Sequence, residues 1–436
     1  MLLQKPAFLL FYHARAAEAS FGEWLGVLWH GLSLDCTVAG YVTAFPVLVV
    51  LASFWIPLSQ RVWRIVLTVY FSLIALVTAA IFAVDLNLYG YWGFRLDGSV
   101  LIYLSDPGEA LASASWGEVL RQILIMLVYA GAMIWSYRWI LRLFRVEPVP
   151  LRGRVVPTVA ALLIGGLTFL AIRGGVTVAT ANVSKVYFSS NMFLNHAATN
   201  PVFSFLSSVG DNENYAEAYP FFEEERRKTL FEELRGNRPG ADAGTPRLLR
   251  SDRPNVVLIL LESFGRTIMD ETVNGEPVMP NMQRFKREGV WFENFFANSF
   301  RTDRGQVAVL CGFPAQTTMS IMKLPRKSAT LPSLARSLGR EGYRSVFMYG
   351  GDLNFTNQAS FMYSTGWEEL IWQKDMQLDA PTSKWGYADD VVTAFFTDEV
   401  LALSERGKPF LAGLLTLSSH EPFEVPYDCL LYTSDA

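Results

Sequence analysis

Cysteine, histidine and charged side chains are all scarce in this 436-residue chain, which has three cysteines, four histidines and 18% Asp, Glu, Lys and Arg. Cys36, Cys311 and Cys429 are too few for a disulfide framework and lack metal-site spacing, so we interpret them as small buried residues. The net charge of −4 argues against nucleic acid as a partner. Apolar residues, in contrast, make up 51% of the chain, which is typical of a protein with membrane-spanning segments.

Four long apolar runs lie in the first half, at residues 38–57, 65–84, 123–137 and 155–172. A helix needs about 20 apolar residues to cross a bilayer, so two runs suffice outright and the other two are marginal. Charged residues interrupt the opening stretch, residues 6–34, which has no signal-peptide cleavage site, and we interpret it as the remnant of another span. The alternative, core helices of a soluble protein, conflicts with the length of the runs and with the charge asymmetry of their loops.

The loops between the runs differ in charge. Basic residues occupy two of the connections, at Arg61, Arg64, Arg138, Arg142, Arg145, Arg152 and Arg154, and acidic residues occupy the loop between them, at Asp85, Asp97, Asp106 and Glu109. Since short loops rich in Lys and Arg stay in the cytoplasm, everything after residue 172 is expected on the other side of the membrane.

A charged segment and then a Gly- and Pro-rich one separate the two halves. "FFEEERRKTLFEELR" predicts an amphipathic helix near the membrane surface, and "GNRPGADAGTP" predicts a linker. We therefore expect a transmembrane domain at 1–175, a juxtamembrane helix and linker at 176–250, a catalytic domain at 251–427 and a non-native-looking tail at 428–436.

Strand and helix patterns alternate in the catalytic domain. "NVVLILLES", "RSVFMYGGD" and "PFLAGLLTLSSH" are apolar runs typical of strands buried on both faces. "NMQRFKREG", "SLARSLGREG" and "VVTAFFTDEVLALSERG" are typical of helices. The alternation predicts an α/β fold with a mostly parallel sheet and helices on both faces.

Polar residues follow each predicted strand, where ligands of open α/β sheets gather. They are Glu262, Asp352 and His420, and the stretch "NSFRTDRG" lies between the first two in sequence. A helix cap, a turn residue, a structural histidine and a polar surface loop are the alternatives, and spacing alone does not decide between them.

Several sequence motifs, in their order along the chain, resemble those of a known family. "NVVLILLESFG", "MPNMQRFKREGVWFENFFAN", "SFRTDRGQVAVLCGFPAQ", "YGGDLNFTNQ" and "LTLSSHEPF" resemble the sulfatase-like phosphoglycerol transferases, the lipoteichoic acid synthase family, within the alkaline phosphatase superfamily. "YWGFRLDG" and "SNMFLNHAATNPVFSF" extend the resemblance into the membrane half, so that it covers nearly the whole chain.

The resemblance implies roles for individual residues. Glu262 matches a metal-binding carboxylate, and Thr302 matches the catalytic threonine that coordinates the metal and attacks phosphorus. His420 matches a substrate-contacting histidine, and Asp352 and Asn357 fall where the family places polar residues around the phosphate.

One divalent cation is implied, and the family uses Mn²⁺; Mg²⁺ or Zn²⁺ are alternatives. Such an ion would favour the threonine alkoxide and polarise a phosphoryl oxygen. Arg301 and Arg304 flank the threonine and are suited to hold phosphate oxygens, although Arg304 could instead pair with Asp303. Ser299 is an alternative nucleophile outside the matched position.

The function implied is a multi-pass protein of a bacterial inner membrane with its catalytic domain outside the cytoplasm. It would move a phosphoglycerol-type group from a phospholipid such as phosphatidylglycerol to a glycan or growing polymer of the envelope, through a phospho-threonine intermediate. The alternatives are a phosphoethanolamine transferase, sulfatase or phosphodiesterase on the same scaffold, and a non-catalytic membrane protein that binds lipid head groups.

The chain departs from the family pattern in two places. The family's paired Asp and His ligands lie beyond "SSHEPF", so we expect the chain as given to be truncated and inactive. Thr356 and Gln358 stand where some members carry a Trp and an Arg that bind the glycerophosphate head group, which leaves the specificity for the head group open.

Overall fold

A computed structural model describes residues 2–104, 115–144, 150, 153–209, 221–235, 249, 251–316, 319–421 and 423–424. Several residues discussed above lie outside these ranges: Asp106, Glu109, Arg145, Arg152, Cys429 and the 428–436 tail.

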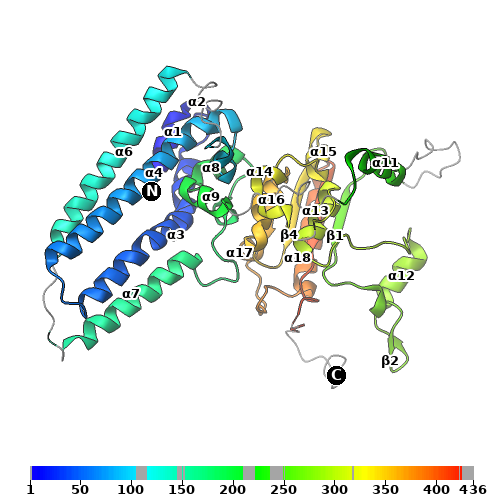
Figure 1. The fold of residues 1–436 in the computed structure, drawn as a ribbon. Helices are drawn as coiled ribbons and strands as arrows, with labels where there is room; N and C mark the ends of the chain where they lie inside the picture. Colours follow the sequence, from blue (N-terminus) through cyan, green and yellow to red (C-terminus); the bar gives the residue numbers. More distant parts are fainter. Residues whose placement is uncertain are drawn as a thin grey trace.

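Four long helices form a bundle at one side of the molecule (Figure 1). They are α3 (Phe21–Ser53), α4 (Gln60–Trp92), α6 (Trp116–Leu143) and α7 (Val155–Arg173). Each is long and apolar enough to cross a membrane. Helix α4 packs along α6, and α3 packs along α7. The four predicted apolar runs are therefore confirmed as helices of spanning length.

The prediction that the opening stretch is the remnant of a separate span is wrong. Residues 21–34 are the first half of α3, and only α1 (Gln4–Phe11) and α2 (His13–Ala16) precede it. Among the charged positions that seemed to interrupt a span, Glu23 forms a capping box with Ser20 at the start of α3. Lys5 and Asp35, on either side of the stretch, pair with each other at 2.7 Å. A 33-residue helix is about 50 Å long, so α3 and α4 each extend well past a hydrocarbon core of about 30 Å.

Short helices cover the end of the bundle where α3 begins and α4 ends. They are η1 (Gly98–Leu104), η3 (Val183–Val186), α8 (Met192–Ala198) and α9 (Pro201–Ser208). Phe8, Tyr89 and Leu194 lie in one buried apolar cluster there. Asp85 is also buried and pairs with Arg95 at 3.2 Å. This end is therefore a packed platform that holds polar groups in fixed places.

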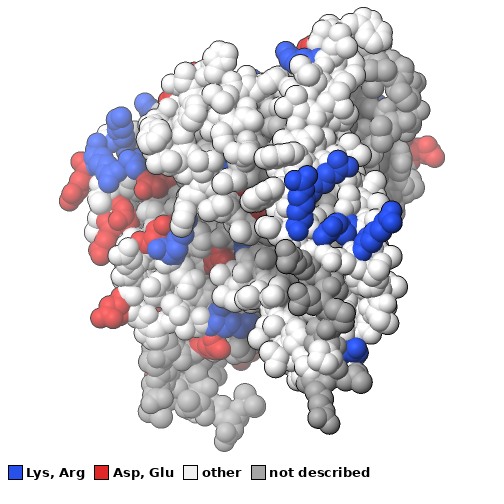
Figure 2. Space-filling model, turned by 90° about the vertical axis from the view of Figure 1, so that its left-hand side faces the viewer, with Lys and Arg blue, Asp and Glu red and all other residues white. Residues whose placement is uncertain are grey.

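Basic side chains gather at the opposite end of the bundle, where α3 passes to α4 and α6 to α7. They include Arg61, Arg64, Arg138, Arg142 and Arg154. A compact group of Lys and Arg side chains stands out on the mostly uncharged face in Figure 2. The asymmetry of charge that the loops predicted is thus present along the length of the bundle.

The second body is an α/β domain around a parallel sheet (Figure 1). Its strands β1 (Val256–Leu260), β4 (Arg344–Tyr349), β5 (Glu369–Trp372) and β6 (Phe410–Leu415) are arranged in the order β1-β6-β4-β5. Three of them were predicted; β5, four residues long, was not. The register places Leu260, Leu415, Tyr349 and Trp372 level, so all four strands end at one edge.

Helices cover both faces of this sheet, as predicted. Side chains of α13 (Thr302–Cys311), α15 (Leu334–Arg340) and α16 (Gln358–Ser364) pack with Phe347 and Tyr349 of β4 in one core. Those of α18 (Asp389–Glu405) pack with Val346 and Met348 in the other. The split follows the alternation of side chains along a strand. The remaining elements are α11 (Glu224–Arg235), η4 (Arg266–Ile268), β2 (Thr272–Val273), β3 (Glu276–Pro277), α12 (Pro280–Glu288), η5 (Ile321–Lys323), α14 (Pro325–Ser328), η6 (Phe355–Asn357) and α17 (Gln373–Met376).

Helix α11 lies on the side of the α/β domain away from the bundle in Figure 1, whereas the sequence analysis expected it near the membrane surface. Residues 183–208, from the same predicted juxtamembrane segment, instead pack against the bundle, where η3 and α8 both contact α3. The part of this segment that lies next to the membrane helices is therefore the stretch before α11.

Direct contacts join the two bodies. Asn182 donates through Nδ2 to the carbonyl of Asn354 at 2.8 Å, and the Ser360 N–H donates to Oγ of Ser184 at 3.0 Å. Arg326 of α14 reaches Asp97, with 3.3 Å between Nη1 and Oδ1. The α/β domain is thus docked on the platform.

Candidate active site

The carboxyl edge of the sheet brings Glu262 and Thr416 together. Glu262 follows β1 and Thr416 follows β6, its parallel neighbour. The backbone N–H of Glu262 donates to Oγ1 of Thr416 at 2.8 Å, and the Thr416 N–H donates to the Leu260 carbonyl at 3.0 Å. These bonds continue the strand pairing past its end and fix the backbone from which the Glu262 side chain projects.

Thr302 is the first residue of α13, and its hydroxyl donates to Oε2 of Glu262 at 2.8 Å. The stretch "NSFRTDRG" is therefore a loop only as far as Arg301, and its last four residues form the first turn of a helix. A helix start has N–H groups without intrahelical partners and a partial positive charge, both of which favour an anion beside Thr302.

Three residues near the edge have the left-handed backbone that non-glycine residues rarely adopt. Ser263 has φ 54°, next to Glu262, and Thr356 and Asn357 have φ 53° and 66° in η6. A β-branched residue such as Thr356 is strained in this region, and such strain concentrates at functional sites.

Asp352 and Asn357 shape the loop after β4. Oδ1 of Asp352 accepts from the Asn354 N–H at 2.9 Å and from its Nδ2 at 2.8 Å, so this oxygen closes a local turn. Asn357 donates through Nδ2 to the Lys323 carbonyl at 3.4 Å. Gln358 is buried and accepts from Gln306 at 3.3 Å, so it belongs to the interior of the domain.

His420 lies on the loop after β6 and packs on the ring of Trp385, with centroids 4.2 Å apart. Asp389, at the start of α18, holds this loop: its two oxygens accept from the N–H groups of Leu417 at 2.6 Å and Ser418 at 2.8 Å. The position of His420 thus depends on a carboxylate that the sequence analysis did not single out.

The two arginines beside Thr302 differ in exposure. Arg301 is half-exposed, and its Nε lies 3.6 Å from Oδ1 of Asp303. Arg304 is buried, and its guanidinium lies 5.8 Å from the ring centre of Phe300. Asp303, which the sequence analysis considered as a partner of Arg304, therefore makes an ion pair with Arg301.

Negative charge converges on the edge around Tyr349. Burial raises the pKa of the Tyr349 phenol, and the carboxylates of Glu262, Asp352 and Asp389 raise it further. Burial also raises the pKa of Asp389, against the opposing effect of its bonds from Ser418 and Leu417. Two carboxylates that follow strands and one at the start of α18 therefore act on one phenol, an electrostatic setting that favours a cation.

Residues 254–435 match the sulfatase family model. The match spans the α/β domain, which is named the sulfatase-family domain after it. Phosphoglycerol transferase I of Xanthomonas campestris pv. campestris is 34% identical over 183 residues, which are 39% of this chain and 26% of that protein. Lipoteichoic acid synthase 1 of Bacillus subtilis is 30% identical over 185 residues, which are 39% of this chain and 27% of that protein. The chain thus matches about a quarter of the length of these curated relatives.

Among solved structures, a protein of the alkaline phosphatase superfamily from Vibrio parahaemolyticus is 30% identical. The match covers 43% of this chain and 46% of the Vibrio chain, with a TM-score of 0.40. The family resemblance found in the sequence is confirmed for the sulfatase-family domain; the membrane half lies outside the matched residues.

The sulfatase-family domain offers two oxygen ligands at its candidate metal position. The Glu262 carboxylate and the Thr302 hydroxyl are already in contact, and oxygen ligands suit Mg²⁺ and Mn²⁺. Within the part of the chain that the structure describes, no group of three or more His, Cys, Asp or Glu side chains could hold a metal. The donor atoms present fit a hard cation but are few.

Sequence reasoning missed Thr416 and Asp389, which position Glu262 and the His420 loop. Asp389 did carry a signal, because "DD" directly before an apolar helix is typical of a helix start at which N–H groups are free. Thr416 carried none, since its role depends on the pairing of β1 with a strand more than 150 residues later.

Proposed function

We propose that this chain is the membrane-anchored part of a transferase that moves a phosphoglycerol-type group from a phospholipid to a cell-envelope glycan or polymer. The proposal rests on the contact between Thr302, at the start of α13, and Glu262, at the edge of a parallel sheet. The names of two relatives, a phosphoglycerol transferase and a lipoteichoic acid synthase, support the same chemistry.

In the first half-reaction, Oγ1 of Thr302 loses its proton and attacks the phosphorus of the lipid head group. The bond from phosphorus to the diacylglycerol oxygen breaks, that oxygen takes up a proton, and the head group remains on Thr302 as a phosphodiester. In the second, a hydroxyl of the acceptor loses its proton and attacks the same phosphorus, the bond to Thr302 breaks, and Oγ1 of Thr302 takes up a proton. N–H groups at the start of α13 and the Arg301 guanidinium are suited to hold the phosphate oxygens.

Glu262 orients the nucleophile in this scheme. Its Oε2 accepts the hydrogen bond of the threonine, and its backbone is fixed by Thr416. Glu262 and Thr302 would also hold the divalent cation, with Mn²⁺ the ion expected. When bound there, the cation supplies a Lewis acid that favours loss of the threonine proton and neutralises phosphoryl charge. His420, Arg304, Asp352 and Asn357 are assigned to substrate binding on the resemblance.

The membrane half sets the place of the reaction. The bundle spans a bacterial inner membrane with its basic end facing the cytoplasm. The platform and the docked sulfatase-family domain then lie on the other side of that membrane. A phospholipid donor is then available at the level of the platform.

A phosphoethanolamine transferase is the second candidate. The observation that favours it is the burial of Gln358, which removes one of the two side chains at the position that reads the glycerophosphate head group in some relatives. The two candidates differ only in the donor.

The deciding experiment uses the protein in detergent with Mn²⁺. It receives phosphatidylglycerol or phosphatidylethanolamine, and the mass of the Thr302 peptide and the release of diacylglycerol are measured. We expect an adduct with the mass of phosphoglycerol, absent in Thr302→Ala and retained in the matched control Ser299→Ala. An adduct on Ser299, with Thr302→Ala still active, would refute the assignment, and a phosphoethanolamine adduct would select the second candidate.

A further inference from the structure

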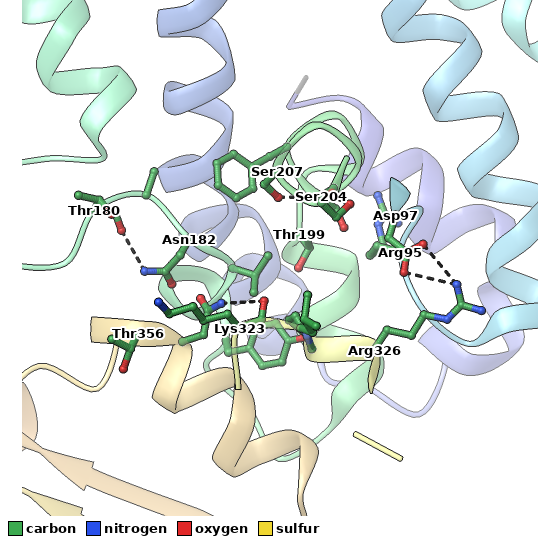
Figure 3. Close-up of a pocket in the computed structure, with 18 of the residues that line it drawn as sticks. Arg95, Asp97, Thr180, Asn182, Thr199, Ser204, Ser207, Lys323, Arg326 and Thr356 are labelled. Atoms are coloured by element: carbon green, nitrogen blue, oxygen red, sulfur yellow. Dashed lines mark hydrogen bonds and ion pairs between the residues drawn. The ribbon is translucent and has the colours of Figure 1, made fainter. Parts of the chain in front are cut away.

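A cavity of about 510 Å³ lies where the sulfatase-family domain meets the platform (Figure 3). Five segments contribute most of its lining: residues 94–97 after α4, residues 178–183 after α7, the helix α9, and the 323–327 and 355–357 stretches of the sulfatase-family domain. Its volume falls within the range of about 300–1,000 Å³ typical of small-molecule sites. Neither body forms this cavity alone.

Positive charge dominates the lining. Its basic residues are Arg95, Arg301, Lys323, Arg326 and Lys327, and Asp97 is the one carboxylate among the described lining residues. Figure 3 shows Arg95, Asp97 and Arg326 on one side of the cavity and Lys323 with Asn182 and Thr356 on the other. Arg326 pairs with Asp97, Arg95 with Asp85 and Arg301 with Asp303, so the net positive charge of the cavity comes from Lys323 and Lys327. The cavity is therefore suited to an anion.

Two deeply buried lining residues also have polar atoms with no partner among the described residues. Arg95 is 5% exposed; it pairs with Asp85 through Nη2, while its Nε and Nη1 have no hydrogen-bond partner. His196 is 4% exposed; its Nδ1 lies 3.1 Å from the Tyr89 hydroxyl, and its Nε2 has no partner. Buried polar atoms without partners are costly, and the two Arg95 nitrogens can only donate, so they favour a ligand that accepts hydrogen bonds.

The other lining residues indicate which kind of molecule bears the anionic group. Serine and threonine hydroxyls of Thr199, Ser204 and Ser207 face the same cavity, and Val178, Phe203 and Phe355 add apolar surface. The lining segments 94–97 and 178–183 directly follow two helices of membrane-spanning length. A molecule with a phosphate, a polyol head and an acyl body fits this combination better than a free ion does.

We propose that this interdomain cavity binds the phosphate-bearing head group of phosphatidylglycerol. The inference deepens the proposed function and rests on it for the choice of lipid. Arg301 lines the cavity and directly precedes Thr302, so a head group bound here contacts the segment that carries the nucleophile. The cavity is then the place where the membrane half presents the donor to the catalytic half.

The test measures lipid binding by the 436-residue chain in detergent, without turnover. Native mass spectrometry follows retention of phosphatidylglycerol and of phosphatidylcholine with the same acyl chains. We expect preferential retention of phosphatidylglycerol and a binding roughly three- to tenfold weaker in Lys323→Gln, since an exposed lysine loses one charge-assisted contact. Arg406→Gln, an exposed change of the same charge outside the cavity, should bind as the unaltered chain does.

A second pair of variants distinguishes the loss of positive charge in the cavity from the loss of the ion pair that joins the two bodies. Arg326→Gln and Asp97→Asn both remove the same ion pair, but only the first removes positive charge from the cavity. Weaker binding in Arg326→Gln with unchanged or tighter binding in Asp97→Asn supports the proposal; equal loss in both refutes it. Equal retention of the two lipids refutes it as well, as does soluble glycerol 1-phosphate binding as tightly as the lipid, which would identify a free-anion site.

The same measurement distinguishes this inference from the transfer reaction. Thr302→Ala should retain phosphatidylglycerol as the unaltered chain does, because its hydroxyl is not part of the cavity lining. Selective binding without any threonine adduct would refute the transferase and leave the cavity site standing. An adduct on Thr302 without selective binding would do the reverse.

Discussion

Oγ1 of Thr302 and Oε2 of Glu262 lie 2.8 Å apart although 40 residues separate them in the chain. One oxygen comes from the start of a helix and the other from the end of a strand, so neither local pattern alone makes the site. The contact is the smallest unit of the candidate active site, and its properties can be measured directly.

The first prediction concerns metal affinity. With two protein ligands, most of the coordination sphere of a divalent cation is left to water, so the 436-residue chain should bind Mn²⁺ more weakly than micromolar. Glu262→Gln keeps an oxygen at the site but removes its negative charge, and it should weaken binding further. Titration calorimetry checks both; micromolar binding that survives Glu262→Gln would place the metal elsewhere.

A second prediction concerns Thr416, which holds the backbone of Glu262. Thr416→Val keeps the shape of the side chain but leaves the Glu262 N–H without its acceptor, at a cost of about 1–3 kcal/mol. The melting temperature in detergent should fall, whereas Thr416→Ser should restore most of it. Equal melting temperatures for the Val and Ser variants would show that the bond contributes nothing.

The third prediction is a pH dependence of stability from His196. Burial, with Arg95 and Arg15 nearby, lowers the pKa of His196 to about 3 from an ordinary value of 6.5. The unfolded chain therefore binds a proton between these values that the folded chain does not, so stability is full above pH 6.5 and falls as the pH decreases below it.

Thermal melting at pH 7 and pH 5 tests this dependence. His196→Gln should melt at more similar temperatures at the two pH values than the unaltered chain does. The exposed His13→Gln serves as the matched control and should leave the difference unchanged. An unaltered pH difference in His196→Gln would show that other groups cause it.

The fourth prediction concerns topology. A reporter that is active only outside the cytoplasm should be active when fused after residue 250 and inactive when fused at Arg61, because the basic end of the bundle is retained in the cytoplasm. A reporter that works only in the cytoplasm should give the opposite pattern. Cytoplasmic activity after residue 250 would reverse the orientation.

Local patterns were enough to predict much of this fold. The spanning helices and the strands β1, β4 and β6 were found because each is a run of apolar residues, although β1 is not buried on both faces as predicted, since Val257 and Ile259 are exposed. The strand β5 was missed because four residues beginning with a glutamate give no such run. The opening stretch was misinterpreted because Glu23, which looked like an interruption of a span, belongs to the capping box at which α3 begins.

The candidate site divides in the same way. Glu262 and Thr302 were found through their blocks of sequence, and the structure brings them into contact. The interdomain cavity was not foreseen, since its lining comes from both halves of the chain and Arg95 is buried there by tertiary packing alone. In the sequence, a charged residue in a loop beside a membrane helix indicates topology. Only the folded structure shows which groups that residue faces.

The docking of the sulfatase-family domain through Asn182, Ser184 and Arg326 has a consequence for the geometry of any reaction at Thr302. A domain on a loose tether can search a volume for its substrates, whereas a docked one holds its nucleophile at a constant height above the lipid surface. In the proposed transfer, both reactants would have to come to that height, the lipid at the bundle and the acceptor by being held there. If the acceptor is a growing polymer, its length would be controlled by whatever delivers the growing end, because a docked domain cannot follow that end.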